Sequence, residues 1–213
     1  MIVNKANRFH YKDILIETHP EVYDPAEDTF LLLDSIDIKK EERVLEIGAG
    51  CGIIGLFCAK IGADVICTDI NPISVELIKK NYLINQNKLK GNFEIRFGDM
   101  FSAIQDYDSF DTVIFNPPYL PTKKEDLTAS WIDVSTSGGE LGLDLTKRYI
   151  ESLSKHLKEE GDAYFIFSSQ CDKKELIKII EKNNYDYIEL KSQNFENETL
   201  TVFKIKKIKR EVL

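Results

Sequence analysis

Residues 43–55 read RVLEIGAGCGIIG, a short apolar run that meets a cluster of glycines. Such a run is typical of a buried strand, and residues 53–62, IIGLFCAKIG, have the spacing of a helix that closes at Gly62. Residues 64–70, DVICTDI, then predict a second strand. A strand, a helix and a strand in this order form a β-α-β unit, so we expect two parallel strands joined by the helix.

The same alternation continues along the rest of the chain. Further strands are predicted at residues 93–97, 110–115, 162–167 and 199–205, and helices at 72–87, 145–157 and 173–183. The helix at 72–87 has a clear start, because Asn71 is a good N-cap and Pro72 suits the first turn. Alternating strands and helices favour a doubly wound α/β fold, with a mostly parallel sheet and helices on both of its faces.

Length and charge limit the classes of protein to consider. The chain has 213 residues, 43% of them hydrophobic, which is enough for one domain with a substantial core. We expect that domain to span residues 1–213, with a short N-terminal extension over about residues 1–40. With 28 Lys and Arg against 36 Asp and Glu the net charge is −8, which disfavours a nucleic-acid partner.

Metal binding and membrane association are not indicated either. The four cysteines form no C-x-x-C pair and the three histidines are scattered, so we expect no bound metal. No stretch approaches the roughly 20 apolar residues of a membrane span, and the N-terminus lacks the apolar core of a signal peptide. We therefore expect a cytoplasmic protein.

Polar residues mark the predicted strand ends, where ligands bind in doubly wound sheets. Glu46 lies in the first strand, Asp69 ends the second, Asp99 follows the third and Asn116 follows the fourth. The three carboxylates can accept hydrogen bonds from an ammonium group, ribose hydroxyls and an exocyclic amine, respectively. Gly50, Gly52 and Gly55 also match the spacing of dinucleotide sites, although glycines here equally serve positive φ angles and close packing alone. A pyrophosphate would be repelled by Glu46.

Asn116, Pro117, Pro118 and Tyr119 end the strand at 110–115, and we call them the NPPY corner. Proline has no backbone N–H and restricts the residue before it, so the strand must stop and a stiff turn must follow. The side-chain carbonyl of Asn116 and the backbone carbonyl of Pro117 can accept both N–H groups of a flat nitrogen, on which Tyr119 can stack. A nitrogen held in this way needs no base before it attacks.

Taken in order, these glycines and carboxylates resemble the motifs of class I S-adenosylmethionine-dependent methyltransferases. The resemblance implies the Rossmann-like fold of that class with a seven-stranded sheet, and S-adenosylmethionine as the cofactor. It implies cofactor contacts by Glu46, Gly48, Gly50, Gly52 and Asn116, by Asp69 at the ribose, and by Ile70, Asp99 and Met100 at the adenine. The NPPY corner resembles the [D/N]-P-P-[Y/F/W] signature of methyltransferases that act on flat nitrogens. By that resemblance Asn116, Pro117 and Tyr119 are catalytic, and they bind the substrate together with Pro118.

Residues 22–34, VYDPAEDTFLLLD, carry a second signal. They predict a helix with Asp24 as its N-cap and Pro25 in its first turn. The run also resembles the segment before the catalytic core of HemK-type protein-glutamine methyltransferases, in their short archaeal and eukaryotic branch. That resemblance implies that Thr29 touches the cofactor and that Tyr23 and Asp28 lie near the substrate.

The resemblance extends to residues 137–145, SGGELGLDL, whose glycines fit the family. The polar segment before them departs from it, so we assign no substrate residue there. Trp131 in that segment is as well explained by packing as by a role in the site.

The HemK-type resemblance implies methyl transfer from S-adenosylmethionine to the side-chain amide nitrogen of glutamine, in the GGQ motif of a class 1 translation release factor. The alternative is an adenine-N6 or guanine-N2 methyltransferase acting on DNA or RNA, which the net charge of −8 and the lack of a base-reading domain disfavour. A nicotinamide-dependent dehydrogenase would leave the NPPY corner unexplained. A non-catalytic binding module would need neither that corner nor the carboxylates.

The same branch implies a partner, a small zinc-binding activator subunit that pairs alongside the sheet. We expect it at the strand 93–97, as an edge of the sheet. Phe93, Ile95 and Phe97 lie on one face of this strand, and its backbone could pair with a strand of the partner. Arg96 points the other way, and we expect it to stay in solvent. An equally good interpretation is that these apolar residues only face the protein's own helices.

Overall fold

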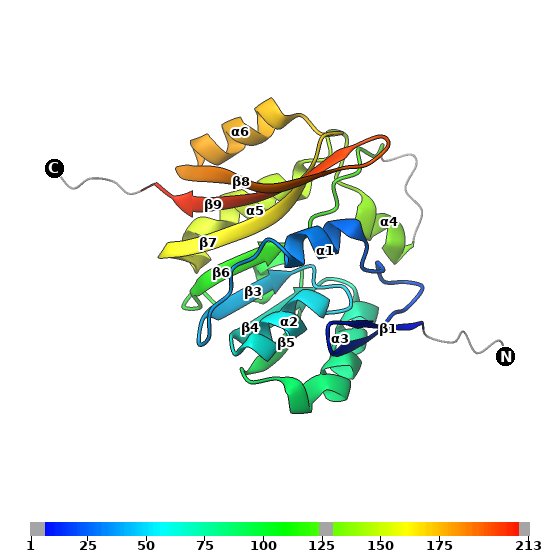
Figure 1. The fold of residues 1–213 in the computed structure, drawn as a ribbon. Coiled ribbons are helices and arrows are strands. Elements are labelled where there is room, and N and C mark those ends of the chain that lie inside the picture. The colour runs from blue at the N-terminus through cyan, green and yellow to red at the C-terminus, as the bar shows by residue number, and fades with distance from the viewer. Residues whose placement is uncertain (1–6, 124–129, 209–213) are drawn as a thin grey trace.

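The computed structural model describes residues 7–123 and 130–208, which form a sheet between two layers of helices (Figure 1). The strands of the sheet are β3 (Arg43–Ile47), β4 (Asp64–Asp69), β5 (Phe93–Phe97), β6 (Phe110–Phe115), β7 (Leu157–Ser168), β8 (Tyr185–Asn194) and β9 (Thr199–Lys207). The helices are α1 (Glu27–Leu33), α2 (Ile53–Ile61), α3 (Pro72–Asn85), α4 (Trp131–Thr136), α5 (Asp144–His156) and α6 (Lys173–Lys182), with 3₁₀ turns η1 (Gln86–Lys88) and η2 (Met100–Ala103). A separate hairpin, β1 (Arg8–Tyr11) and β2 (Ile14–Glu17), precedes them.

The seven strands of the sheet lie in the order β5-β4-β3-β6-β7-β9-β8. Neighbours are parallel from β5 to β7, whereas β9 runs antiparallel to both β7 and β8. The predicted fold class is therefore confirmed. The chain moves outward from β3 to β4 and β5 and then returns to β6 on the other side of β3. This reversal makes a switch point between β3 and β6, where doubly wound sheets bind their ligands.

Successive residues of the central strands feed two hydrophobic cores, one on each face of the sheet. In β3, Val44 packs in the core that contains α1, α2 and α3, whereas Leu45 packs in the core that contains α5 and α6. Tyr164 and Phe165 of β7 divide in the same way, and all four side chains are fully buried. Because both faces are covered, these strands are continuous apolar runs in the sequence, which made them predictable.

The ends of α2 and α3 lie where local sequence signals place them. The side chain of Asn71 accepts a hydrogen bond from Ile73 N–H (2.9 Å), and Pro72 is the first residue of α3. Gly62 caps the end of α2 with a φ of 118°, in the left-handed region that favours glycine.

The predicted start of α1 is wrong. The helix begins at Glu27, and its N-cap is Ala26, whose side chain makes no capping bond. Asp24 and Pro25 precede the helix instead. This segment runs along the pocket described below, which Pro25 helps to line.

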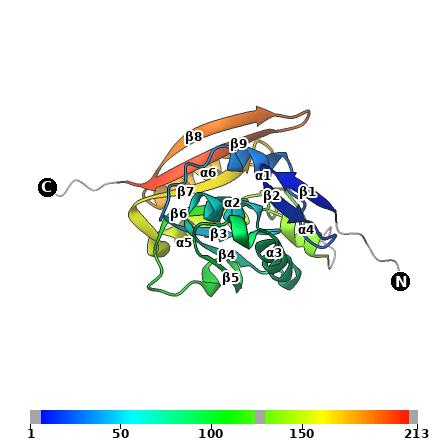
Figure 2. The same cartoon turned by 60° about the horizontal axis from the view of Figure 1, so that its bottom comes forward.

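Three parts of the fold were not predicted from the sequence: the β1–β2 hairpin, which lies beside α3 (Figure 2), helix α4, and strand β8. Strand β8 is an edge of the sheet and most of its side chains are exposed, so it lacks the apolar pattern of a buried strand. No helix in the described part of the chain is long and apolar enough to cross a membrane.

Candidate active site

A pocket lies at the carboxyl ends of β3, β4 and β6, beside the switch point of the sheet. The segment before α1, the turn after β5, helix α4 and the start of α5 complete its wall. The predicted site residues that line it are Tyr23, Asp28, Thr29, Glu46, Gly48, Gly50, Asp69, Ile70, Asp99, Met100, Asn116, Pro117, Pro118 and Tyr119. Gly52 is not among the lining residues, because it faces α3, where a Cβ would lie 3.0 Å from Ile78.

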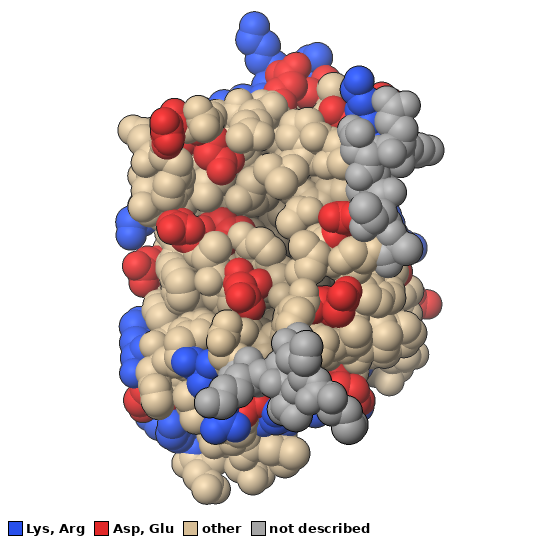
Figure 3. All heavy atoms as spheres, turned by 90° about the vertical axis from the view of Figure 1, so that its right-hand side faces the viewer, with Lys and Arg blue, Asp and Glu red and all other residues tan. Residues whose placement is uncertain are grey.

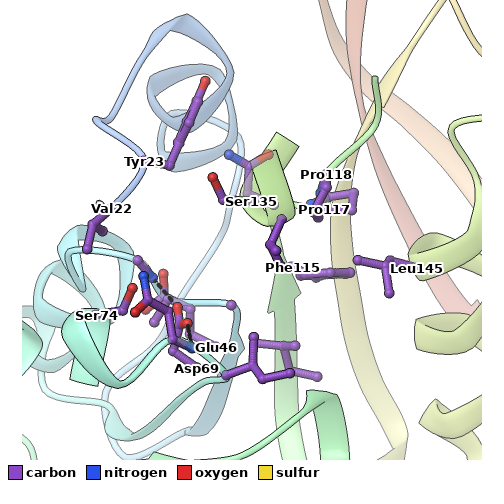
Figure 4. A pocket seen from close by; sticks show the side chains of 18 of the residues that line it. Val22, Tyr23, Glu46, Asp69, Ser74, Phe115, Pro117, Pro118, Ser135 and Leu145 are labelled. Atoms are coloured by element: carbon purple, nitrogen blue, oxygen red, sulfur yellow. Dashed lines mark hydrogen bonds between the residues drawn. The ribbon is translucent and has the colours of Figure 1, made fainter. Parts of the chain in front are cut away.

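The pocket has two ends, shown in Figure 4. Glu46, Asp69 and Ser74 lie together at one end, which we call the carboxylate end. Tyr23 and Pro118 lie at the other, which we call the corner end because the NPPY corner is there. A ligand that fills the pocket therefore contacts buried carboxylates at one end and the corner at the other.

Residues 48–52 form the loop between β3 and α2, and we call it the glycine loop. Gly48 and Gly50 have φ angles of 60° and 56°, which glycine adopts without steric cost. A Cβ on Gly48 would also lie 3.2 Å from the ring of Phe115. The N–H of Gly50 donates to Oδ2 of Asp69 (2.8 Å), which ties the loop to the end of β4.

The carboxylate of Asp69 is nearly buried and already holds several donors. Its Oδ1 accepts from Asn71 N–H (2.8 Å), and the hydroxyl of Ser74 bonds to the same carboxylate. Burial raises the pKa of Asp69, while the N–H groups of Asn71 and Gly50 lower it. Because each oxygen has two lone pairs, this fixed carboxylate can accept further bonds from a ligand.

Glu46 lies deeper, under the start of α2. Its Oε2 accepts hydrogen bonds from Gly55 N–H (2.8 Å) and from the thiol of Cys67 (3.2 Å). Complete burial raises the pKa of Glu46 to about 8, and the neighbouring charge of Asp69 adds to the rise. A cation bound in the carboxylate end would favour the ionised form of Glu46.

Replacing Glu46 by glutamine is expected to flatten the pH dependence of stability. The folded chain keeps a proton on Glu46 up to a pH of about 8, whereas the unfolded chain releases it near pH 4.5. The contribution of Glu46 to the free energy of unfolding therefore falls as the pH rises from about 4.5 to about 8. Thermal unfolding of both ligand-free proteins across this range checks the prediction. A difference in melting temperature that does not change with pH would contradict it.

The NPPY corner is held by Asp28, the second residue of α1. The Nδ2 of Asn116 donates to Oδ2 of Asp28 (3.0 Å), and Tyr23 donates its hydroxyl to the same oxygen (3.2 Å). A carboxylate only accepts hydrogen bonds, so it fixes which way the amide of Asn116 points. The Oδ1 of Asn116 is buried and has no hydrogen-bond partner among the described residues. The pocket thus contains one oriented acceptor without a donor.

The glycines of residues 137–145 support the corner from behind. The N–H of Gly138 donates to the carbonyl of Leu120 (2.9 Å), and a Cβ on Gly138 would lie 2.8 Å from the carbonyl oxygen of Pro118. Gly142 has a φ of 70° and lies against the carbonyl of Tyr119. Side chains at these positions would displace the corner, which explains the glycines physically.

The remaining predicted residues lie on an exposed rim near the end of β4. Ile70 is 41% exposed, and Met100 has a φ of 52°, a strained angle for a residue other than glycine. The Oδ2 of Asp99 accepts from the guanidinium of Arg148 (2.7 Å), so this carboxylate has a partner that the sequence did not indicate. Leu145 and Phe115 add apolar surface between the rim and the corner.

Known proteins resemble this chain over most of its length. The family model described as methyltransferase small domain matches residues 14–193. The chain belongs to the methyltransferase small domain family. The matched span includes every residue that lines the pocket.

Individual relatives indicate which members of this family the chain resembles. A putative protein N5-glutamine methyltransferase of Methanocaldococcus jannaschii is 40% identical over 167 residues, which cover 77% of this chain and 81% of the relative. Human methyltransferase HEMK2 is 28% identical over 195 residues, covering 88% and 90% of the two chains. The solved E. cuniculi Mtq2-Trm112 complex, described as methylating the eRF1 translation termination factor, matches with 25% identity and a TM-score of 0.68 and covers 88% of this chain and 99% of that one. The predicted HemK-type family and enzyme class are confirmed.

Helix α4 contributes pocket residues of this methyltransferase that sequence reasoning missed. They are Trp131, Val134, Ser135 and Thr136. The helix has only six residues, and it begins where the side chain of Ser130 accepts a hydrogen bond from Ile132 N–H (3.1 Å). The presence of the single tryptophan of the chain in a polar segment was the one available signal.

The pocket of this methyltransferase is negatively charged. Its lining includes the carboxylates of Asp28, Asp69 and Asp99 and, among the described residues, no lysine, arginine or histidine. Glu46 also lines it, and a bound cation would favour its ionised form as well. Figure 3 shows the side of the molecule on which α4 lies, with acidic side chains across the face and basic ones mainly toward its edges. Such a field favours a positively charged ligand.

Proposed function

We propose that this enzyme transfers a methyl group from S-adenosylmethionine to the side-chain amide nitrogen of glutamine, in the GGQ motif of a class 1 translation release factor. The names of the relatives support this substrate, since one is a putative protein N5-glutamine methyltransferase and another acts on a translation termination factor. The observation that carries the proposal is the buried, unpaired Oδ1 of Asn116 in the pocket.

Asn116 can activate an amide nitrogen by orienting it. A primary amide has two N–H donors, and its nitrogen is a poor nucleophile because the lone pair is delocalised. Oδ1 of Asn116 would accept one N–H and the carbonyl of Pro117 the other, which favours the more tetrahedral nitrogen that attacks. Since Asp28 already holds the Asn116 amide, this acceptor needs no reorganisation when the substrate binds.

Tyr23 and Tyr119 form part of the wall at the corner end, where they would keep the substrate amide away from water. Burial raises the pKa of Tyr23 and of Tyr119 well above the ordinary value, and the charge of Asp28 adds to both shifts. Both phenols therefore stay neutral at physiological pH. Tyr119 offers a flat face on which a planar amide can stack.

The carboxylate end has the donor set that S-adenosylmethionine requires. This cofactor supplies an electrophilic methyl group on a positively charged sulfur. Asp69 would accept bonds from its ribose hydroxyls, Ile70 would flank the adenine, and the carboxylate of Glu46 would favour its positive charge. A nicotinamide dinucleotide fits less well, because its pyrophosphate would meet the same carboxylates without a basic partner among the described lining residues.

The exocyclic amine of adenine or guanine would also match the two acceptors of the NPPY corner. The charge of the pocket favours the protein substrate, because the carboxylates of Asp28, Asp69 and Asp99 line it and repel a phosphate backbone. Methylation of the purified class 1 release factor, followed by mass spectrometry of its GGQ peptide, tests the proposal. We expect one methyl group on the glutamine and none when that glutamine is replaced by alanine. Label found only in nuclease-sensitive material would overturn the substrate.

We further infer that β5 is the edge at which a small zinc-binding subunit of the Trm112 kind pairs. Strand β5 is an edge of the sheet. The carbonyl of Asn92 and the N–H of Gly98 bond to β4, so by alternation the backbone groups of Ile95 and Phe97 face away from the sheet. Phe97 is also 62% exposed. An open edge with an exposed aromatic side chain suits strand addition.

The other side chains of β5 serve the chain's own packing. Phe93 stacks on Tyr82 with ring centroids 5.4 Å apart, and Ile95 packs on the core below α2 and α3. The expectation that Arg96 stays in solvent is wrong, because its guanidinium bonds to Glu94 (2.7 Å) and Asp108 (2.9 Å). Only Phe97 of the three predicted apolar residues is left for a partner.

Replacing Phe97 by proline is expected to abolish co-purification with the activator subunit. Proline removes the outward N–H of this residue but none of the bonds to β4. The matched control is Phe97→Ala, which removes the ring and keeps the N–H, and it should retain most of the binding. Pull-down from co-expressing cells measures both variants, with melting temperatures to confirm folding. Full retention by Phe97→Pro would exclude β5 as the pairing edge.

A further inference from the structure

The free edge of the β1–β2 hairpin is closed by side chains of α3. Thr18 N–H donates to the carbonyl of Asn7 (3.0 Å) across the hairpin, so by alternation the backbone groups of Leu15 and Glu17 point away from β1. Strand β2 lies directly against α3, as Figure 2 shows for the hairpin. Backbone groups in such a place require partners, which here come from the helix.

Two asparagines one helical turn apart supply these partners. Asn85 accepts from Leu15 N–H (3.0 Å) and donates to the Leu15 carbonyl (2.7 Å). Asn81 accepts from Glu17 N–H (2.9 Å) and donates to the Glu17 carbonyl (3.0 Å). The spacing matches, since four helical residues rise about 6 Å and two strand residues about 6.6 Å. Both asparagine side chains are fully buried.

Asn81 makes one bond that Asn85 does not make, and it reaches the glycine loop. Its Nδ2 also donates to the carbonyl of Cys51 (2.9 Å), whereas the remaining Nδ2 bond of Asn85 stays within α3 (2.8 Å). The N–H of Glu17 fixes the orientation of the Asn81 amide, because only the oxygen can accept it.

We propose that Asn81 is a positioning residue for the glycine loop and thereby for the cofactor. Glycines at positive φ leave this loop free to take many conformations unless it is anchored. Asp69 accepts a hydrogen bond from the N–H of Gly50, and Asn81 donates one to the carbonyl of Cys51. Two side chains from different elements therefore fix two consecutive residues in the middle of the loop. A loop fixed before binding loses less entropy when the ligand arrives.

The same helix also fixes the wall at the corner end. Asn71 at the start of α3 donates its Nδ2 to the carbonyl of Glu21 (2.8 Å), two residues before Tyr23. Helix α3 thus holds the glycine loop through Asn81 and the segment that carries Tyr23 through Asn71. The inference rests on the proposed function only for the identity of the cofactor.

The test compares Asn81→Ala with Asn85→Ala. Asn85 is a matched control, because it clamps the hairpin through the same two bonds but does not contact the loop. Hydrogen exchange of the ligand-free proteins reports on the amides of residues 50–53, and titration with S-adenosylmethionine gives the Kd. If Asn81→Ala does not fold, Asn81→Ser replaces it.

We expect faster exchange in the glycine loop and a roughly tenfold higher Kd for Asn81→Ala only, as for the loss of one buried hydrogen bond. Both variants should lose thermal stability to a similar extent, because both release one clamp on the hairpin. Equal loop exchange in the two variants would overturn the proposal. Wild-type protein that binds no S-adenosylmethionine would contradict the proposed function, while the exchange comparison would still decide the role of Asn81.

Discussion

Replacing Asn116 by alanine is expected to slow methyl transfer to the release factor by about a hundred- to a thousandfold, the usual cost of removing one preorganised hydrogen-bonding group. The Kd for S-adenosylmethionine should stay within about threefold of the native value, because the lost acceptor acts on the substrate nitrogen. Single-turnover rates and cofactor titration on the same preparation separate the two effects. The physical reason is the lone Oδ1 of Asn116, which is the acceptor that the substrate amide would meet.

Two further variants sharpen this test. Asp28→Asn keeps the shape of the side chain but offers both a donor and an acceptor, so the amide of Asn116 is no longer held in one orientation. Its turnover should also fall, by less than that of Asn116→Ala. Asp186→Ala, at the exposed start of β8 and at the opposite edge of the sheet from the pocket, is the remote control and should behave as the native enzyme. A native rate for Asn116→Ala would rule out the mechanism given for the corner.

Replacing Asp69 by alanine is expected to weaken S-adenosylmethionine binding by about ten- to a hundredfold. Hydrogen bonds to a charged group contribute about 1.5 to 3 kcal/mol, and this carboxylate would accept the ribose hydroxyls. The substitution also frees the N–H groups of Gly50 and Asn71, so the glycine loop is left with only the bond from Ala49 N–H to the carbonyl of Thr68 (3.0 Å) as its backbone link to β4. Isothermal titration gives the affinity, and thermal unfolding shows whether the variant folds.

Asp64→Ala is the matched control for Asp69→Ala. Asp64 begins the same strand and likewise accepts a backbone N–H, from Asn92 (2.8 Å), but it lies at the opposite end of β4 from the pocket. Its removal should lower stability without changing the Kd. If Asp69→Ala does not fold, Asp69→Asn keeps an acceptor for Gly50 and removes the charge. Native affinity in a folded Asp69 variant would exclude this residue from the cofactor site.

Much of the candidate site was predictable, because its signals are local. Glycines at a strand end, a carboxylate at the end of the next strand, and the NPPY corner each follow from the chemistry of a few consecutive residues. Parallel strands bring their carboxyl ends to one edge of a sheet, so these residues had to meet once the fold class was known. What could not be predicted is the bonding between them. Asp28 was expected near the substrate, and the structure shows that it holds the amide of Asn116.

The sequence by itself determined the alternation of the buried strands with helices α2, α3, α5 and α6 along the chain and the rim on which the pocket lies, since strands buried on both faces are continuous apolar runs that glycine and proline interrupt. Only the tertiary structure decided which way the Asn116 amide points, what Arg148 binds, and how α4 closes the pocket. It also decided that the side chains of Asn81 and Asn85 bond to the backbone groups on the free edge of β2. Each of these features depends on hydrogen bonds or packing between segments far apart in the chain, and such partners leave no periodic pattern in either segment.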